Sequence, residues 1–207
     1  MKPKTAKLWA KQDQHQGDRW RLFSAVAQAI DAETVFYPGS YVDVAPSFVF
    51  ASVTYLDVDK RARAFFDDTG GVLKIIADHD GPPEADVSFI HRSYDLVLDL
   101  PTEHFDLLVS LFAGFVSEHC TQHLRIGGTL LVNPSHGDAA MASIDPRYEL
   151  EGVITSRSGE YRVDTKDLDT YLIPKKPQPI TAETLHHTCR GIGYTKTPYA
   201  YLFTRVA

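Results

Sequence analysis

Residues 34–59 read TVFYPGSYVDVAPSFVFASVTYLDVD, and this stretch decides the fold. It holds two apolar runs, the first ending at Gly39 and the second at Asp57, 18 residues further on. A glycine turn places backbone N–H groups at the carboxyl end of a strand, and an acid that ends the next strand can accept hydrogen bonds from ribose hydroxyls. The stretch therefore predicts the opening β-α-β unit of a nucleotide-type cofactor site.

Strand-like and helix-like segments alternate through the first two thirds of the chain. Strands are expected at 35–37, 52–56, 87–90, 106–112 and 129–132. Apolar residues at three- and four-residue steps predict helices over 18–31, 59–66, 73–77 and 112–124, with a strand as the alternative for 73–77. Asp18 and Asp59 are the expected N-caps, and Gly127-Gly128 is expected to end the last of these helices. This order predicts a parallel sheet with helices on both faces.

The last third has a different pattern. Residues 148–156 and 160–163 flank Arg157-Ser158-Gly159 and predict an antiparallel hairpin. A helix is expected from Thr181 to the neighbourhood of Gly191, after a PKKPQP loop, and residues 199–203 are expected to form the last strand. Residues 1–17 are polar and are expected to be irregular or weakly helical, which leaves 18–207 as a single α/β domain.

Composition narrows the classes of function. The 207 residues are 43% hydrophobic and 23% charged, with a formal net charge of −6, which argues against a general polyanion binder. No apolar run reaches the roughly 18 residues that span a bilayer, and the first 30 residues have no signal-peptide core, so we expect a cytoplasmic protein with no membrane partner. Cys120 and Cys189 are expected to be reduced, partly buried thiols on helices. No feature specifies an oligomeric state.

Taken in order, these segments resemble class I S-adenosylmethionine-dependent methyltransferases over residues 18–206. The sequence YPGSY at 37–41 stands where that family has its glycine-rich first loop, and Asp57 stands at the acidic end of its second strand. FDLLVS at 105–110 is similar to the family's fourth strand, and HLRIGGTLLV at 123–132 to its turn into the fifth. A helix followed by YLFTR at the end of the chain is also similar.

The resemblance implies a three-layer, Rossmann-like fold: a mostly parallel seven-stranded sheet, helices on both faces and an antiparallel C-terminal strand. It implies S-adenosylmethionine as the cofactor, with the first loop under its methionine part, Asp57 on the ribose diol, and the end of the fourth strand beside the sulfonium. The residues implied in cofactor contact are Gly39, Ser40, Tyr41, Asp57, Val58, Ser93, Tyr94, Ser110 and Leu111.

The first loop departs from the family pattern and is degenerate. The family usually has an acid before the first glycine and two or three glycines in the loop. Here Tyr37-Pro38 take the place of the acid and its neighbour, and Gly39 is the one glycine left. Asp43 could supply a carboxylate from the following segment, whereas Tyr41 brings a large side chain to the loop. The alternative is a catalytically inactive, methyltransferase-like scaffold that serves as a binding protein.

The activity that the resemblance implies is methyl transfer to a small molecule. Such catalysis rests mainly on proximity and alignment, because the cofactor supplies the reactive methyl group. If a base is needed, His136 and Asp138 after the fifth strand are the candidates, and Tyr41 could orient the substrate. The acceptor pocket is expected in the variable segments 1–20, 79–104 and 134–180.

Other classes fit less well. The G-x-G-x-x-G fingerprint of NAD enzymes is missing after the first strand. The sequence NPSH at 133–136 resembles the motif of amino-methylating enzymes, but it follows the fifth strand where theirs follows the fourth. His119 and His123 have helical spacing without a third ligand, so no metal site is expected, and half-buried positions are expected for them. RNA modification guided by the lysines at 2, 4, 7 and 11 stays a weaker alternative and predicts salt-sensitive RNA binding.

Overall fold

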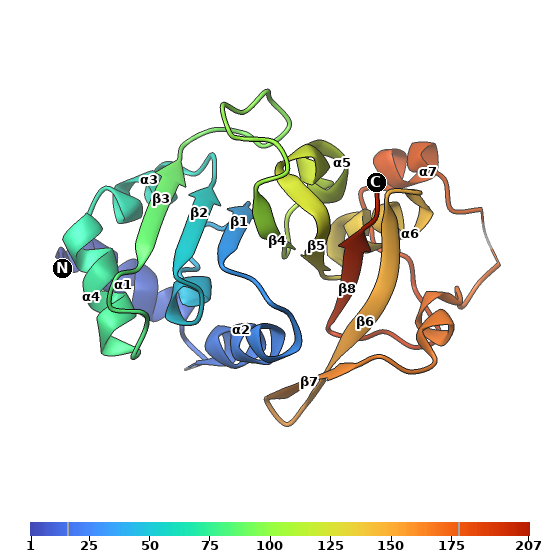
Figure 1. The fold of residues 1–207 in the computed structure, drawn as a ribbon, viewed down its shortest axis with the longest axis horizontal. Coiled ribbons are helices and arrows are strands. Elements are labelled where there is room, and N and C mark those ends of the chain that lie inside the picture. Colours follow the sequence, from blue (N-terminus) through green and yellow to red (C-terminus); the bar gives the residue numbers. More distant parts are fainter. Residues whose placement is uncertain (16, 178) are drawn as a thin grey trace. The chain divides into compact units, whose positions relative to one another are not determined.

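The computed structural model describes residues 1–15, 17–177 and 179–207. Gln16 lies outside the described residues, and so does Gln178, which belongs to the PKKPQP loop. The chain divides into two compact units, Met1–Val97 and Leu98–Ala207. The described residues form eight strands, as the apolar segments predict and one more than the seven that the resemblance implied, with three in the first unit and five in the second (Figure 1). A single domain over 18–207 stays a prediction.

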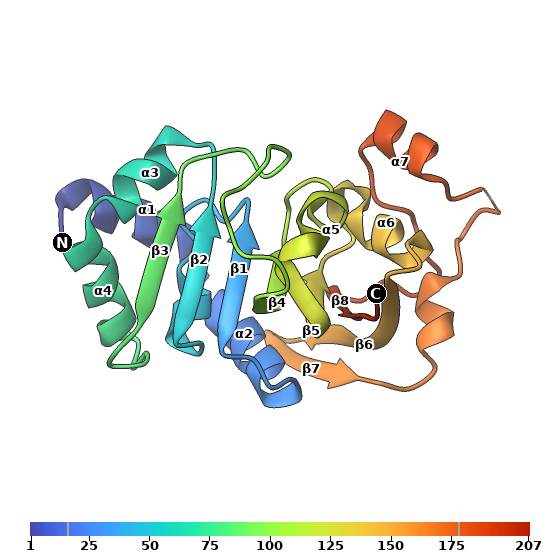
Figure 2. The same cartoon turned by 45° about the horizontal axis from the view of Figure 1, so that its top comes forward.

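The first unit contains a parallel sheet in the order β3-β2-β1. These strands are β1 (Thr34–Pro38), β2 (Ser52–Leu56) and β3 (Asp86–Ile90), and Figure 2 shows them side by side. All three predicted strands are confirmed within a residue or two. Because the strands are parallel, their carboxyl ends share one edge of the sheet, and this edge carries Gly39 and Asp57.

The helices of the first unit are α1 (Pro3–Gln12), α2 (Asp18–Ala29), α3 (Lys60–Phe66) and α4 (Thr69–Asp78). The cap at Asp59 is confirmed, since its carboxylate accepts a hydrogen bond from the Arg61 amide at 2.7 Å. The cap at Asp18 is wrong: Gly17, with φ 76°, is the N-cap, and Asp18 is the first helical residue. Residues 73–77 are helical, so their strand alternative is wrong.

The N-terminal segment is more ordered than expected. α1 is a helix of ten residues that starts at Pro3, where a missing N–H costs nothing. The Asp68 carboxylate accepts hydrogen bonds from the Lys2 amide and the Thr5 hydroxyl, each at 2.7 Å. Asp68, 63 positions after Thr5, therefore holds α1 at the start of α4. Local sequence patterns do not predict a contact between residues so far apart.

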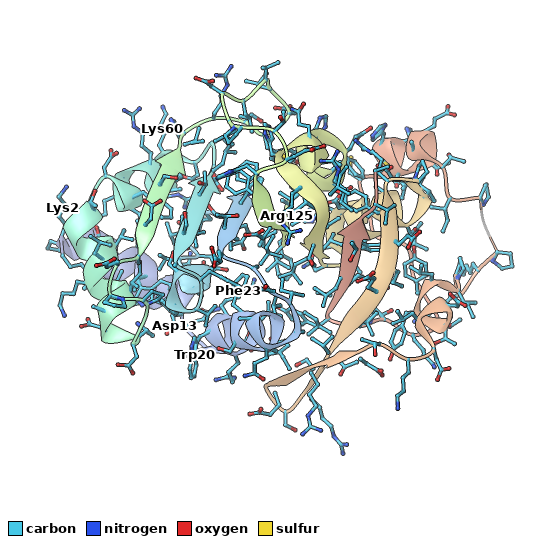
Figure 3. All side chains as sticks on the ribbon, viewed as in Figure 1. Lys2, Asp13, Trp20, Phe23, Lys60 and Arg125 are labelled. Atoms are coloured by element: carbon cyan, nitrogen blue, oxygen red, sulfur yellow. The ribbon has the colours of Figure 1, made fainter. Side chains whose placement is uncertain are left out.

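Aromatic side chains fill much of the core of the first unit. Phe23 and Tyr37 are almost fully buried, with ring centroids 6.2 Å apart. Phe66 stacks on Phe89 at 4.6 Å and on Tyr55 at 4.9 Å. Figure 3 shows Phe23 on the side of α2 that faces the strands, with the half-exposed Trp20 on the far side. The structure thus confirms that α2 is amphipathic and packs its apolar face against the strands.

The second unit contains a mixed sheet in the order β4-β5-β8-β6-β7. β4 (Phe105–Ser110) and β5 (Leu124–Val132) are parallel, and β8 (Ala200–Arg205) is antiparallel to β5 and to β6 (Tyr148–Arg157). β7 (Glu160–Asp164) completes the predicted hairpin at the edge of this sheet. The antiparallel C-terminal strand is confirmed (Figure 1).

The helix predicted over 112–124 is wrong in its extent. α5 covers only Val116–Cys120 and is followed by one 3-10 turn, after which β5 starts at Leu124. Gly127 and Gly128 lie inside β5, where the register against β4 shifts. Gly127 has φ 77°, and a Cβ on Gly128 would meet the Asp106 carbonyl oxygen at 3.1 Å. These glycines therefore allow a bulge in a strand and do not end a helix.

The remaining helices of the second unit are short. α6 covers Asp138–Ile144, and α7 covers Ala182–Thr188. Thr181 caps α7 through a reciprocal capping box with Thr184. α7 ends at Thr188 because Cys189 adopts φ 48°, so the predicted end near Gly191 is a few residues too late. In the described part of the chain, no helix is long and apolar enough to cross a membrane.

Candidate functional site

The first loop lies at the carboxyl end of β1 and is fixed to the end of β2. The amides of Gly39 and Ser40 donate to the Leu56 carbonyl oxygen at 2.7 and 3.4 Å. Gly39 has φ 69° and Tyr41 φ 49°, so the chain turns through two left-handed residues within three positions. Glycine adopts this conformation without strain, but tyrosine does not. The loop is a defined turn despite its single glycine.

Asp57 connects this loop to the start of α3. One carboxylate oxygen accepts a hydrogen bond from the Tyr41 amide and the other from the Asp59 amide, both at 2.7 Å. The side chain is half-buried, and the Asp57 amide donates to the Ile90 carbonyl oxygen at 3.2 Å. Since each carboxylate oxygen has about two acceptor positions, Asp57 can still accept hydrogen bonds from a bound molecule.

Ser40 contributes a buried hydroxyl to the loop. Its side chain is 2% exposed, and its Oγ has no hydrogen-bond partner among the described residues. Buried polar groups in folded proteins nearly always have a partner, so an exception next to a predicted cofactor loop calls for an explanation. A polar group of a bound cofactor would be such a partner, and on this point the residues present fit S-adenosylmethionine.

Asp43 holds the carboxylate that the first loop lacks, but in a different place. It is buried and accepts hydrogen bonds from the Tyr37 hydroxyl at 3.2 Å and from the Ala45 amide at 3.3 Å. Arg19 lies 3.5 Å away. Burial raises the pKa of Asp43, and the charge of Arg19 opposes this effect. Asp43 therefore braces Tyr37 from inside the unit, a role that the sequence did not reveal.

A cation–aromatic pair stands next to Asp57. The Arg61 guanidinium lies 5.2 Å from the centroid of the Tyr41 ring. It also pairs with Asp59 at 2.5 Å, and hydrogen bonds from Arg61 lower the pKa of Asp59 to about 2. Val58 is 61% exposed, and its carbonyl oxygen is 2.9 Å from Nε2 of His91. Arg61 and His91 were not among the predicted site residues, because outward-pointing charges carry no distinctive pattern.

Ser93 and Tyr94 lie partly buried in the turn that follows β3. They belong to the same edge of the parallel sheet as Gly39 and Asp57, as the resemblance implied. The Leu96 amide donates to the Ser93 carbonyl oxygen at 3.4 Å, which closes the turn. Their contact with adenine stays a prediction.

In the second unit, Ser110 ends β4 and binds a buried carboxylate. Its hydroxyl donates to Asp138 at 2.5 Å, and the Ser117 hydroxyl donates to the other oxygen at 2.5 Å. Asp138 is 1% exposed, and burial raises its pKa to about 6 against these hydrogen bonds. Asp138 thus joins the end of β4 to the starts of α5 and α6. Leu111, the next residue, is buried.

His136 is the more accessible of the two candidate bases. It is exposed, follows β5 and adopts φ 57°. Its Nδ1 is 3.0 Å from the Ser135 hydroxyl, which donates to the Asn133 amide oxygen at 2.8 Å. The Phe112 amide donates to the same oxygen at 3.2 Å. Asn133 and Ser135 were noticed only as part of a motif, and their link to His136 was missed.

His119 and His123, both expected to be half-buried on a helix, differ in burial. His123 is 2% exposed, with Nδ1 3.0 Å from the Pro101 carbonyl oxygen, so a half-buried position is wrong for it, whereas the side chain of His119 is 39% exposed and lies 3.9 Å from Glu118. His186 lies 2.7 Å from the same glutamate. Within the described residues, no three His, Cys, Asp or Glu side chains are placed to hold a metal ion. Cys120 is buried and Cys189 is exposed, so the expected partial burial is wrong for both, and no disulfide joins them in the described part of the chain.

Comparison with known proteins identifies the fold. No family model matches the sequence, and a search of curated proteins finds no match. The O-methyltransferase TomG from Streptomyces achromogenes, involved in tomaymycin synthesis and solved with S-adenosylmethionine, is 14% identical over 79% of this chain and 87% of its own, with a TM-score of 0.51. The 16S rRNA methylase RmtB is 13% identical over 95% of this chain and 65% of its own, with a TM-score of 0.50.

A putative S-adenosylmethionine-dependent methyltransferase from Methanococcus maripaludis is 16% identical over 63% of this chain, with a TM-score of 0.48. The aligned part spans 61% of that protein's length. The resemblance seen in the sequence is confirmed at the level of architecture. The chain has the α/β, Rossmann-like fold of the class I S-adenosylmethionine-dependent methyltransferases.

Proposed function

We propose that this protein is an S-adenosylmethionine-dependent methyltransferase that acts on a small-molecule acceptor. The observation that supports the proposal most is the position of Asp57, whose carboxylate holds the first loop through the Tyr41 amide at 2.7 Å. A carboxylate fixed at the end of the second strand is placed to accept hydrogen bonds from a ribose diol.

The residues of the first unit divide the work of holding the cofactor. Asp57 takes the ribose hydroxyls, while Gly39 and Ser40 lie under the methionine part, with the Ser40 hydroxyl as a polar contact. Arg61 holds the Tyr41 ring beside them. When bound, the cofactor supplies an electrophilic methyl group, and the protein contributes proximity and alignment. Ser110 and Leu111 of the second unit stay predicted contacts.

A small acceptor suits the chain better than RNA does. The formal net charge of −6 gives no general attraction for phosphate, although the fold is shared with an rRNA methylase. TomG, which is described as an O-methyltransferase of tomaymycin synthesis, shows that the same fold serves small-molecule chemistry.

Calorimetric titration tests the proposal. S-adenosylmethionine and its demethylated product should each bind saturably, and Asp57→Ala should weaken binding by about tenfold or more, because hydrogen bonds to a charged group contribute about 1.5–3 kcal/mol. Asp67→Ala is the matched control, since Asp67 is an exposed carboxylate at the end of α3. Circular dichroism confirms that both variants are folded. No binding by the wild-type protein up to millimolar cofactor would contradict the proposal.

A second candidate function is a binding scaffold that does not use the cofactor. Both oxygens of Asp57 already accept backbone N–H groups, so the carboxylate has a sufficient structural role. The left-handed Tyr41 and its packing against Arg61 also fill space in the loop. Under this hypothesis a partner complex forms without any cofactor, and methyl transfer that Asp57→Ala abolishes would rule it out.

A further inference from the structure

The outer edge of β3 presents backbone groups that the sheet of the first unit does not use. β3 stands at the end of the strand order, and no described strand pairs with its outer side. The Asp86 amide donates to the Ala51 carbonyl oxygen at 2.8 Å, so the backbone groups of Asp86 face β2. Backbone groups of successive strand residues point to opposite edges, and those of Val87 and Phe89 therefore point outward.

This edge is regular and is not blocked. β3 pairs with β2 in an unbroken register over its whole length. Its five residues include no proline and no lysine, which are among the devices that usually keep an edge strand from pairing with another chain. An edge strand of this kind can bind an extended peptide as one more strand of the sheet.

An apolar groove runs along the same edge. A cavity of about 480 Å³ lies between β3 and the helices α3 and α4. Its lining includes Val87 and Phe89 of β3, Phe66 of α3, and Val72 and Leu73 of α4. Both views show α4 beside β3, on the side away from β2 (Figures 1 and 2). Residues directly opposite each other in paired strands have side chains on the same face, so a peptide residue opposite Val87 or Phe89 reaches this groove.

The charges around the edge favour a basic ligand at one end. Asp86 is exposed and lies on the face of β3 opposite to the groove, and the exposed Glu84 comes two residues before the strand. Asp67, at the groove, is 63% exposed and has Arg63 at 3.9 Å. Arg92 comes after the other end of the strand. The start of β3 is therefore acidic, and its complement is a basic segment.

We propose that the outer edge of β3 binds an extended peptide of a partner protein as an antiparallel strand. The peptide alternates apolar side chains, which enter the groove, with polar ones, which are basic beside Glu84 and Asp86. Antiparallel pairing is slightly more stable per residue than parallel pairing, and it places the basic residues at the C-terminal end of the peptide. The backbone of Val87 and Phe89 supplies the hydrogen bonds. This surface belongs to the first unit alone, and the proposal is independent of the cofactor.

A second copy of this chain fits the edge less well than a peptide does. Two antiparallel β3 strands in one sheet are related by a two-fold axis perpendicular to the sheet. That symmetry brings the α3 and α4 helices of both copies to the same face, where each α4 already lies beyond its own β3 (Figure 2). A single extended peptide has no such helices.

Calorimetric titration of the full chain with a designed peptide tests the proposal. The probe is acetyl-Thr-Val-Thr-Val-Lys-Val-Lys-amide, whose valines face the groove and whose lysines lie beside Asp86 and Glu84 in the antiparallel pairing. We expect saturable binding. The same peptide with glutamate in place of both lysines is the matched control and should bind about tenfold more weakly or less, because like charges then meet. No binding of the lysine peptide, or equal affinity for both peptides, would overturn the proposal.

Val87→Pro tests the role of the backbone. It removes an outward N–H and leaves the hydrogen bonds to β2 in place, and proline is tolerated in an edge strand where the N–H faces solvent. Affinity for the lysine peptide should fall by about tenfold or more, since a hydrogen bond is lost and the proline ring stands in the way of the added strand. Val87→Ile keeps the N–H and should bind as the wild-type protein does. Unchanged affinity in a folded Val87→Pro variant would contradict the proposal.

Amide hydrogen exchange of the wild-type protein gives a result that needs no variant. The bound lysine peptide should slow exchange at Val87 and Phe89, while Asp86, Ser88 and Ile90, which face β2, change little. Binding without this alternation would overturn the proposal. Sedimentation velocity tests the other occupant: a wild-type dimer that Val87→Pro dissociates would show that a second copy covers the edge, and would also overturn it.

Discussion

Asp57 follows β2 and Asp138 begins α6, and the surroundings of these two carboxylates give them different roles. Asp57 is half-buried and accepts hydrogen bonds from two backbone amides of the first unit, which leaves acceptor positions for a ligand. Asp138 is fully buried and receives two serine hydroxyls as well as the Ser117 amide. We therefore expect Asp57 to bind the cofactor and Asp138 to hold the second unit together.

The burial of Asp138 predicts a pH dependence of stability. Burial raises its pKa from 3.8 to about 6, so between these values the folded state binds more protons than the unfolded state. The free energy of unfolding then falls as pH rises through this window, by up to about 3 kcal/mol. Urea unfolding at both ends of the window measures the effect, and Asp138→Asn should remove this component.

Asp145 is the control, because its pKa is shifted in the opposite direction. Partial burial acts to raise the pKa of Asp145, but hydrogen bonds from Arg147 and the charge of Arg147 together lower it. Its contribution to stability is therefore present above its ordinary pKa and is lost as pH falls below it. A wild-type stability that fails to decrease relative to Asp138→Asn as pH rises from 4 to 6 would contradict the role given to Asp138.

Residue-level patterns predict one part of the candidate site and miss another part. Gly39 and Asp57 could be predicted because a turn glycine and an acid at strand ends have a local spacing. Asn133, Ser135 and His136 could not, since their hydrogen-bonded chain depends on left-handed backbone at Phe112 and His136. Neither residue type signals that conformation in a sequence.

Among the elements, β5 departs most from expectation. Two glycines usually suggest a helix end, but these lie in a strand whose register shifts against β4. The helical spacing of apolar residues before them persists for only the five residues of α5. Tertiary pairing with β4 and β8 outweighs the local pattern here, and a single sequence gives no measure of that pairing.

Gly128→Ala tests this account of β5. The new Cβ would meet the Arg125 carbonyl oxygen at 2.9 Å and the Asp106 carbonyl oxygen at 3.1 Å, so the variant should lose about 1–3 kcal/mol of stability. Gly70→Ala in α4 is the matched control, since a Cβ there meets nothing within 4 Å and should stabilise the helix slightly. Equal melting temperatures for the two variants would contradict the bulge.

The attachment of α1 to α4 predicts a local effect. Asp68→Ala removes the acceptor for the Lys2 amide and the Thr5 hydroxyl, so α1 should open more often. Hydrogen exchange should accelerate in residues 3–12 while the strands of the first unit keep their protection. Asp78→Ala, which removes an exposed pair with Lys74, is the control. Unchanged exchange in α1 would show that this attachment is not what holds the helix.

At the scale of the whole molecule, the order of elements carried more information than any single motif. All eight strands were placed within a few residues of their positions except β5, and their directions in each unit match the expected parallel and antiparallel parts. TomG and RmtB are only 14% and 13% identical to this chain, so overall identity does not reveal the shared fold. The alternation of strand-like and helix-like segments does reveal it, because an α/β core needs that order.

A crystal structure with the demethylated cofactor bound tests the central claim most directly. The account predicts both ribose hydroxyls within about 2.6–3.2 Å of the Asp57 carboxylate oxygens, with the Ser40 hydroxyl in contact with the methionine part. Crystals of the Asp57→Ala variant, grown with the same cofactor concentration, should show weaker electron density for the cofactor or none. A cofactor bound elsewhere, or a wild-type first loop closed over Asp57 with no cofactor at saturating concentration, would contradict the account.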